Sequence, residues 1–258
     1  MSAVLDRPWT LQDSVGVYLR EARFEFLRVL RTPGFVLPTL LFPALFYVFF
    51  GLLFAKGHVD VATYMLAAYG TFGVMAPALF GFGVGVAMER ERGVLAMKRV
   101  APLPPLAYFA AKAAMAMLFA LIVVLMLFVL GAAFGGVRLP AIRWVSLAVV
   151  LVLGAVPFCA LGLLVGLFVN GQASAAVINL IYLPMSFLAG LWVPLQFLPH
   201  WLQGVAVWLP TYHLAEIALR VAGSDARGGI PMHVAYLVVF TAACVALAVF
   251  GWRRVRDR

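Results

Sequence analysis

Charge-free apolar runs dominate the chain and are separated by short clusters of charged residues. A helix that crosses the hydrocarbon core of a membrane needs about 20 predominantly apolar residues. The run over 144–215 is too long for one crossing, but Asn170, Gly171 and Gln172 interrupt it, which indicates two helices. The pattern predicts six membrane-spanning helices, at about 34–55, 61–88, 106–135, 142–169, 174–194 and 230–252.

A segment with helical periodicity, apolar on one face and charged on the other, precedes the first apolar run. Over residues 14–31, the stripe that includes Leu19, Phe26 and Leu30 is apolar, and Arg20 and Arg23 lie away from it. Such a pattern is typical of an amphipathic helix at a membrane interface, either as a plain anchor or with a further role. The predicted organisation is a cytoplasmic N-terminal segment (1–33), a six-helix domain (34–252) and a basic tail (253–258).

Composition supports a membrane class. The mean hydropathy is +1.05 and 65% of residues are hydrophobic, far from the usage of soluble domains. The predicted fold class is therefore all-α: a polytopic membrane protein with six transmembrane helices and an interfacial N-terminal helix. The net charge of +9 does not indicate nucleic-acid binding, because the basic residues flank membrane spans, where lipid headgroups attract them.

The distribution of Lys and Arg predicts the orientation. Short loops rich in these residues stay in the cytoplasm. Both termini and the link between helices 2 and 3 carry most of the basic residues, whereas Lys56, Arg138, Arg143, Arg220 and Arg227 fall on the other side. The sequence predicts a multi-pass protein of the cytoplasmic (inner) membrane with both termini in the cytoplasm.

Catalytic and ion-coupling patterns are missing from the sequence. Lys56, Lys98 and Lys112 lack the residues of a phosphate-binding loop, and the four histidines have no metal-binding spacing. The predicted span interiors contain no Asp or Glu, which ion-coupled carriers use near the bilayer midplane. Lys112 lies near the start of the third span and is expected to snorkel to the cytoplasmic headgroups. We expect no enzyme activity, cofactor or metal in this chain.

The segment 88–101, MERERGVLAMKRVA, gathers six charges that cannot lie in hydrocarbon. Its apolar positions Val94, Leu95 and Met97 predict a short amphipathic helix along the membrane surface. Glutamates would lie at its start and basic residues at its end, as the helix dipole favours. Such a helix can dock into a groove of a soluble partner, although a solvated loop that only fixes topology is the alternative.

Two stretches resemble a known family, the type-2 ATP-binding cassette (ABC) permeases. GVAMERERGVLAMKRVAPLPPLAYFAAK is similar to the family's cytoplasmic link between helices 2 and 3, with Pro102 and Lys112 matching and Val94 replacing the usual Thr or Ser. The resemblance implies contact with an ATPase subunit by Glu89, Arg90, Glu91, Arg92, Gly93, Leu95, Met97 and Lys98. FLAGLWVPLQFLPHWLQGVAVWLPTYHLAEIALR resembles the family's extracellular re-entrant signature, which is matched by Phe187, Gly190, Pro194, Pro199, Trp201, Pro210, Tyr212 and Arg220.

The resemblance implies a permease subunit of an ATP-driven exporter. Two permease copies, as a homodimer or heterodimer, would form the path within the membrane lipids, and a separate ATPase subunit would drive it. Thr71, Asn179 and Tyr182 are isolated polar residues within the predicted spans, which favours a drug, lipid-linked or amphipathic cargo, as in multidrug or lipid efflux. A polysaccharide is the alternative cargo. The alternatives are a secondary, ion-coupled transporter and a membrane-embedded lipid-modifying enzyme, for which the sequence offers no polar catalytic set.

Overall fold

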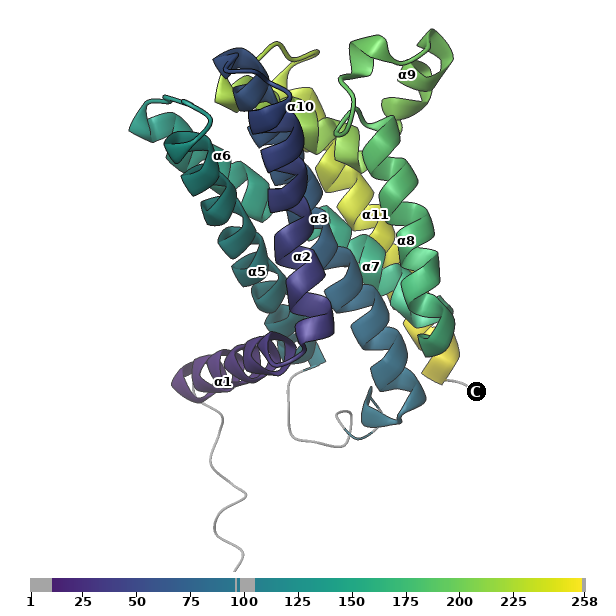
Figure 1. The fold of residues 1–258 in the computed structure, drawn as a ribbon. Helices are drawn as coiled ribbons and strands as arrows, with labels where there is room; N and C mark the ends of the chain where they lie inside the picture. The colour runs from purple at the N-terminus through teal and green to yellow at the C-terminus, as the bar shows by residue number, and fades with distance from the viewer. Residues whose placement is uncertain (1–10, 96, 98–104, 257–258) are drawn as a thin grey trace, which may run out of the picture.

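A computed structural model describes residues 11–95, 97 and 105–256 (Figure 1). Over these residues the chain forms helices and loops without a β-strand, which confirms the predicted all-α class. The helices of the first half are α1 (Leu11–Leu30), α2 (Pro33–Phe46), its π-helical continuation η1 (Tyr47–Leu53), α3 (Val59–Glu91) and α5 (Pro105–Ala133). Those of the second half are α6 (Ala141–Leu153), α7 (Val156–Phe168), α8 (Gly171–Leu188), η2 (Leu195–Phe197), α9 (His200–Ala206), α10 (Pro210–Ala222) and α11 (Ile230–Arg256).

Within the described residues, six helices are long and apolar enough to cross a membrane, the number that the sequence predicts. They are Pro33–Leu53, Val59–Glu91, Tyr108–Ala133, Ala141–Phe168, Gly171–Leu188 and Ile230–Gly251. The fifth ends at Leu188, before the expected boundary at 194, because Gly190 adopts a left-handed φ of +82° that no α-helix contains. The second extends past 88 to Glu91, and this extension carries the polar residues of the site.

The fourth span is built from two helices in sequence. Helix α6 ends at Leu153 and α7 begins at Val156, with Pro157 in the first turn of α7. Proline has no N–H to donate to the carbonyl four residues earlier, and its ring crowds that carbonyl. The break therefore falls where Pro157 would oppose a continuous helix.

Helix α3 forms the centre of the bundle. Of its most apolar window, 72% is buried inside the chain, against 22% for the window of the last span. Glycines let α7 approach it closely: a Cβ on Gly162 would lie 2.9 Å from the Leu79 carbonyl oxygen, and one on Gly166 only 2.7 Å from the Gly83 carbonyl oxygen. Small residues of this kind allow membrane helices to pack backbone against backbone.

The two ends of the bundle differ. Helix α1 lies across one end, at which α11 also finishes, whereas α9 and α10 lie at the opposite end (Figure 1). Helix α1 packs against α5, and its Phe26 ring contacts Phe119 at 5.1 Å between centroids. The polar end of α3 therefore lies beside α1, and the segment between the fifth and sixth spans covers the other end of the bundle.

Candidate functional site

The charged residues after position 88 begin inside the last turn of α3. The expectation that Glu89 and Glu91 start a separate surface helix is wrong, because α3 keeps its helical geometry to Glu91. Gly93 then ends it with a left-handed φ of +72°, and its N–H donates to the Arg90 carbonyl at 3.1 Å. The glutamates consequently lie at the C-terminal end of a membrane helix, facing its neighbours.

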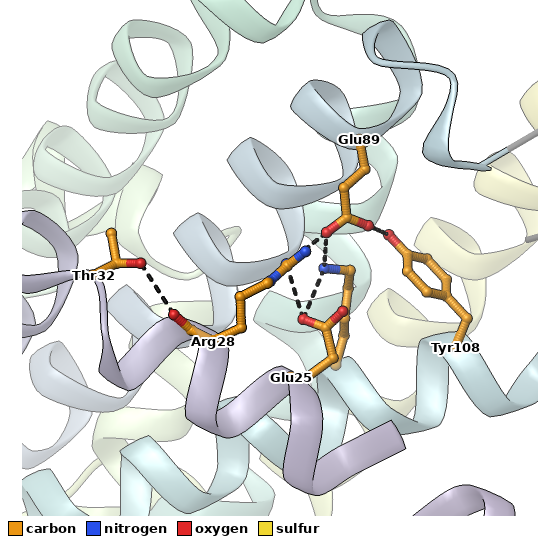
Figure 2. Close-up of polar contacts among 6 residues, drawn as sticks. Glu25, Arg28, Thr32, Glu89 and Tyr108 are labelled. Atoms are coloured by element: carbon orange, nitrogen blue, oxygen red, sulfur yellow. Dashed lines mark hydrogen bonds and ion pairs between the residues drawn. The ribbon is translucent and has the colours of Figure 1, made fainter. Parts of the chain in front are cut away.

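Glu89 belongs to an ionic cluster that joins three helices, with Glu25, Glu89 and Lys112 buried and Arg28 partly exposed (Figure 2). Its Oε1 lies 2.5 Å from the Arg28 Nη2 of α1 and 3.0 Å from the Lys112 Nζ of α5. Its Oε2 accepts a hydrogen bond from the Tyr108 hydroxyl at 2.5 Å. Glu25 of α1 completes the cluster, with its Oε2 at 2.9 Å from the Arg28 guanidinium and 3.4 Å from the Lys112 amine.

Charge balance makes this burial tolerable. Two carboxylates face two cations, and buried charges persist only where they are paired and hydrogen-bonded. Burial alone would lower the pKa of Arg28, but the carboxylates of Glu89 and Glu25 outweigh that effect, and the pKa lies above its ordinary value. The cluster thus holds α1, α3 and α5 together as ionised groups.

Lys112 does not snorkel as expected. Its side chain is fully buried, its amine contacts Glu25 and Glu89, and it lies 5.1 Å from the centre of the Tyr108 ring. The stem of a snorkelling lysine would lead its amine to the headgroups, but here the amine meets carboxylates from α1 and α3 first. Sequence reasoning missed the roles of Glu25, Arg28 and Tyr108, although a lysine inside a span was a signal that an acidic partner is needed.

The next two side chains of the same turn reach two further helices. The Arg90 guanidinium donates to the Leu167 carbonyl and, at 3.0 Å, to the Val169 carbonyl at the end of α7. Glu91 Oε1 accepts the Gly171 N–H at 2.7 Å at the start of α8. A cation at a helix C-terminus and a carboxylate at a helix N-terminus both complement the helix dipole and satisfy free backbone groups.

We call the group formed by Glu89, Arg90 and Glu91 together with Glu25, Arg28, Tyr108 and Lys112 the polar junction. The remaining predicted contact residues lie just beyond it. Arg92 is exposed, Leu95 is buried and Met97 is 63% exposed. Residues 94, 95 and 97 are helical, while Lys98, Pro102 and residues 96 and 99–101 of the expected helix lie outside the described residues.

The predicted extracellular signature is spread over the other end of the bundle. Gly190 makes the turn after α8, and its carbonyl accepts from the Tyr64 hydroxyl at 3.4 Å. Pro199 precedes α9, and Pro210 is the first residue of α10. Phe187 lies in the last turn of α8 and is partly exposed, and Pro194 directly precedes η2. Trp201 is 70% exposed, whereas Tyr212 is buried. The Arg220 side chain donates to the Ala226 carbonyl at 2.7 Å. These residues shape turns and helix starts over several elements and do not converge on one point.

Of the three polar points predicted within the spans, two serve the interior of the chain. The Thr71 hydroxyl donates to the Ala67 carbonyl, and the buried Tyr182 hydroxyl donates to the Phe72 carbonyl. Asn179 alone of the three is exposed, on the outer face of α8. Only Asn179 is therefore available to a molecule outside this chain.

Six apolar helices, four of which are linked at one end by the polar junction, define a multi-pass membrane protein. The model of the ABC-2 type transporter family matches residues 21–222, and the chain belongs to this family. A protein of Bacillus subtilis (strain 168) named "Putative transport permease YvfS" is 29% identical over 231 residues, which cover 88% of this chain and 94% of that protein. The family match begins within α1 and ends with α10, so it spans the whole junction.

Proposed function

We propose that the chain is the permease subunit of an ATP-driven exporter, coupled at the junction end to a separate ATPase subunit. One observation carries the proposal: three successive side chains, Glu89, Arg90 and Glu91, connect α3 to α1 and α5, to α7, and to α8. A force applied at residues 92–97 would reach all of these helices through short polar contacts. The chain itself would carry no ATP hydrolysis.

The proposed layout follows the polarity of the two ends. Residues 1–33 would form a cytoplasmic segment in which α1 lies in the membrane interface, 34–252 the transmembrane domain, and 253–258 a cytoplasmic basic tail. Residues 189–229, with α9 and α10, would form the extracellular re-entrant segment. The excess of Lys and Arg at the junction end supports this orientation in the cytoplasmic (inner) membrane.

A second permease copy, identical or related, would complete the translocation path. The face of α8 that carries Asn179 supports this, because an exposed amide in the middle of a span is costly in lipid and is satisfied across a helix interface or in a water-filled path. The neighbouring Leu180 is 75% exposed and Leu183 41% exposed on the same helix. A face of this mixed character suits an amphipathic, drug-like or lipid-linked cargo.

Exposed residues next to the junction allow docking to be tested without disturbing the buried charges. Arg92→Glu reverses an exposed charge at the proposed contact, and Arg20→Glu makes the same change on the exposed side of α1. We expect Arg92→Glu to weaken co-purification with the partner ATPase subunit by about 10-fold and to lower the stimulated ATP hydrolysis of that subunit. Arg20→Glu should leave both unchanged.

The same preparation distinguishes the exporter from an ion-coupled carrier. Purified chain in liposomes should move no cargo under a proton or sodium gradient, and transport should appear when the ATPase and ATP are added. Gradient-driven transport by the chain alone, or an Arg92→Glu variant that binds and stimulates the ATPase normally, would contradict the proposal.

A further inference from the structure

His213 and His233 face each other at the end of the bundle opposite the junction. His213 belongs to α10 and His233 to α11, and their Nδ1 atoms lie 2.8 Å apart. Both side chains are buried, with 5% and 1% of the residue exposed. At this distance and burial the two nitrogens form a direct hydrogen bond, with no room for a water molecule between them.

The outer nitrogens fix the protonation of the pair. His213 Nε2 lies 3.0 Å from the Val207 carbonyl oxygen, and His233 Nε2 lies 2.7 Å from the Arg227 carbonyl oxygen. A carbonyl only accepts, so each Nε2 carries a hydrogen and donates it. If both rings were neutral, both Nδ1 atoms would be bare acceptors pointing at each other. A hydrogen bond between them requires a third ring proton, which gives the pair one positive charge.

We propose that His213 and His233 form a binding site for one proton, shared between their Nδ1 atoms, that ties α10 to α11. An aromatic ring favours the resulting cation, because Tyr236 stacks on the His213 imidazole with 3.7 Å between centroids. A metal ion is a poor substitute, because no group of three His, Cys, Asp or Glu side chains in the described residues is placed to hold one.

Burial limits the site to a single proton. Among the neighbouring ionisable groups, Glu216 of α10 interacts electrostatically with His233, and Arg227 of the α10–α11 loop meets His233 through its backbone carbonyl. Asp60 and Tyr64 of α3 and Asp225 of the loop line a pocket together with Glu216 and Arg227. On α6, Arg143 lies against Gly223 at the end of α10. Burial lowers the pKa of His213, and the charge of His233 lowers it further, so a fourth ring proton is disfavoured.

The site makes the contact between α10 and α11 depend on pH in both directions. On acidification both Nδ1 atoms become donors and the bond breaks, and on loss of the shared proton both become acceptors. Because the folded state takes the second proton less readily than the unfolded chain, stability falls as pH drops below the ordinary histidine value of about 6.5. It falls again at alkaline pH when the shared proton leaves. α10 carries Pro210, Tyr212 and Arg220, so its attachment would respond to external pH.

Nitrogen NMR of the full chain, labelled with ¹⁵N-histidine in nanodiscs, tests the proposal directly. At about pH 8, where a free histidine is neutral, we expect the pair to show three protonated ring nitrogens and a coupling across the Nδ1–H···Nδ1 bond. His200→Asn serves as the matched control, because His200 is exposed at the start of α9 and its removal should leave these signals unchanged. Two neutral rings with one N–H each at this pH would overturn the proposal.

A second measurement needs no assignment of signals. A double-mutant cycle with His213→Ala and His233→Ala, followed by unfolding in mixed micelles, should give a coupling of about 10- to 100-fold in the unfolding equilibrium constant near neutral pH, as expected for a charged hydrogen bond. The coupling should shrink at acidic and at strongly alkaline pH. A coupling that does not change with pH, or signals that change when a chelator is added, would show that no shared proton holds the pair.

Discussion

At the scale of single residues, the amine of Lys112 determines how the junction must behave. It contacts carboxylates from two helices, and Glu25 and Glu89 in turn share Arg28. A paired cluster of this kind adds little net stability, because desolvation offsets the attraction between the charges. Removing one member is different, since it leaves a buried charge without compensation.

Lys112→Met should therefore destabilise the chain strongly. The substitution keeps the length of the side chain but leaves two carboxylates to share Arg28, and breaking a buried pair in this way costs about 3–5 kcal/mol. We expect a clear fall of the thermal unfolding midpoint in detergent. Adding Glu89→Gln restores neutrality and should recover part of the loss.

Lys56→Met is the control for Lys112→Met, because it removes the same charge from an exposed position. Its midpoint should match that of the unsubstituted chain. Equal midpoints for Lys56→Met and Lys112→Met would mean that the Lys112 contacts are not structural.

At the scale of elements, close backbone packing between α3 and α7 is the feature most sensitive to a single atom. The Gly83 carbonyl lies where a Cβ on Gly166 would need to be, and a backbone carbonyl cannot rotate away. Arg90, about two turns further along α3, contacts the carbonyls of Leu167 and Val169 at the end of α7, within three residues of Gly166. Packing at Gly166 and the junction therefore depend on the same separation of α3 and α7.

Gly166→Ala should push these helices apart. The new methyl group would lie 2.7 Å from a backbone oxygen, and overpacking of this kind costs about 1–3 kcal/mol. The matched substitution Gly204→Ala, in α9, meets nothing within 4 Å, and there alanine should be neutral or stabilising by up to about 1 kcal/mol. Comparing the unfolding midpoints of the two variants separates steric crowding from helix propensity. A Gly166→Ala variant as stable as Gly204→Ala would argue against close contact.

The sequence predicts the positions of the helices better than the contacts between them. The six spans follow from apolar runs of sufficient length, because a single chain segment in lipid can satisfy its backbone hydrogen bonds only by forming a helix. The sequence places the end of α3 too early, because charged residues indicate the end of a membrane span, whereas the helix continues to Glu91 and ends at the left-handed Gly93.

The partners of Lys112 could not be read from spacing. Glu25 is 87 residues away and Glu89 is 23 residues away, and only the arrangement of α1, α3 and α5 brings them together. Likewise, the four histidines offered no motif, and the pair formed by His213 and His233 depends on how α10 packs against α11. The sequence could predict that the charges near Glu89 matter, but it could not predict which helices they join.

At the scale of the whole molecule, the bundle has two chemically different ends. The junction end carries α1 and the polar turn of α3, and the opposite end carries α9, α10 and the histidine pair. The Lys and Arg distribution predicts that the first lies in the cytoplasm, because the sequence assigns fourteen of the nineteen basic residues to the predicted cytoplasmic side and five to the other side. The proposed docking of an ATPase and the proposed response to external pH both depend on this predicted orientation.

Introduced cysteines can report the membrane orientation directly, because we expect the two native cysteines not to react with maleimide. Cys159 and Cys244 are each only 5% exposed and lie within the spans, so the unsubstituted chain should take up no maleimide. Arg20→Cys places a thiol on the exposed side of α1, and Gly204→Cys places one on the open surface of α9. In intact cells a membrane-impermeant maleimide should label only Gly204→Cys, and Arg20→Cys should react only after the membrane is opened. The reverse pattern would place the junction outside the cell, out of reach of ATP, and both variants reacting from one side would contradict the six-span topology itself.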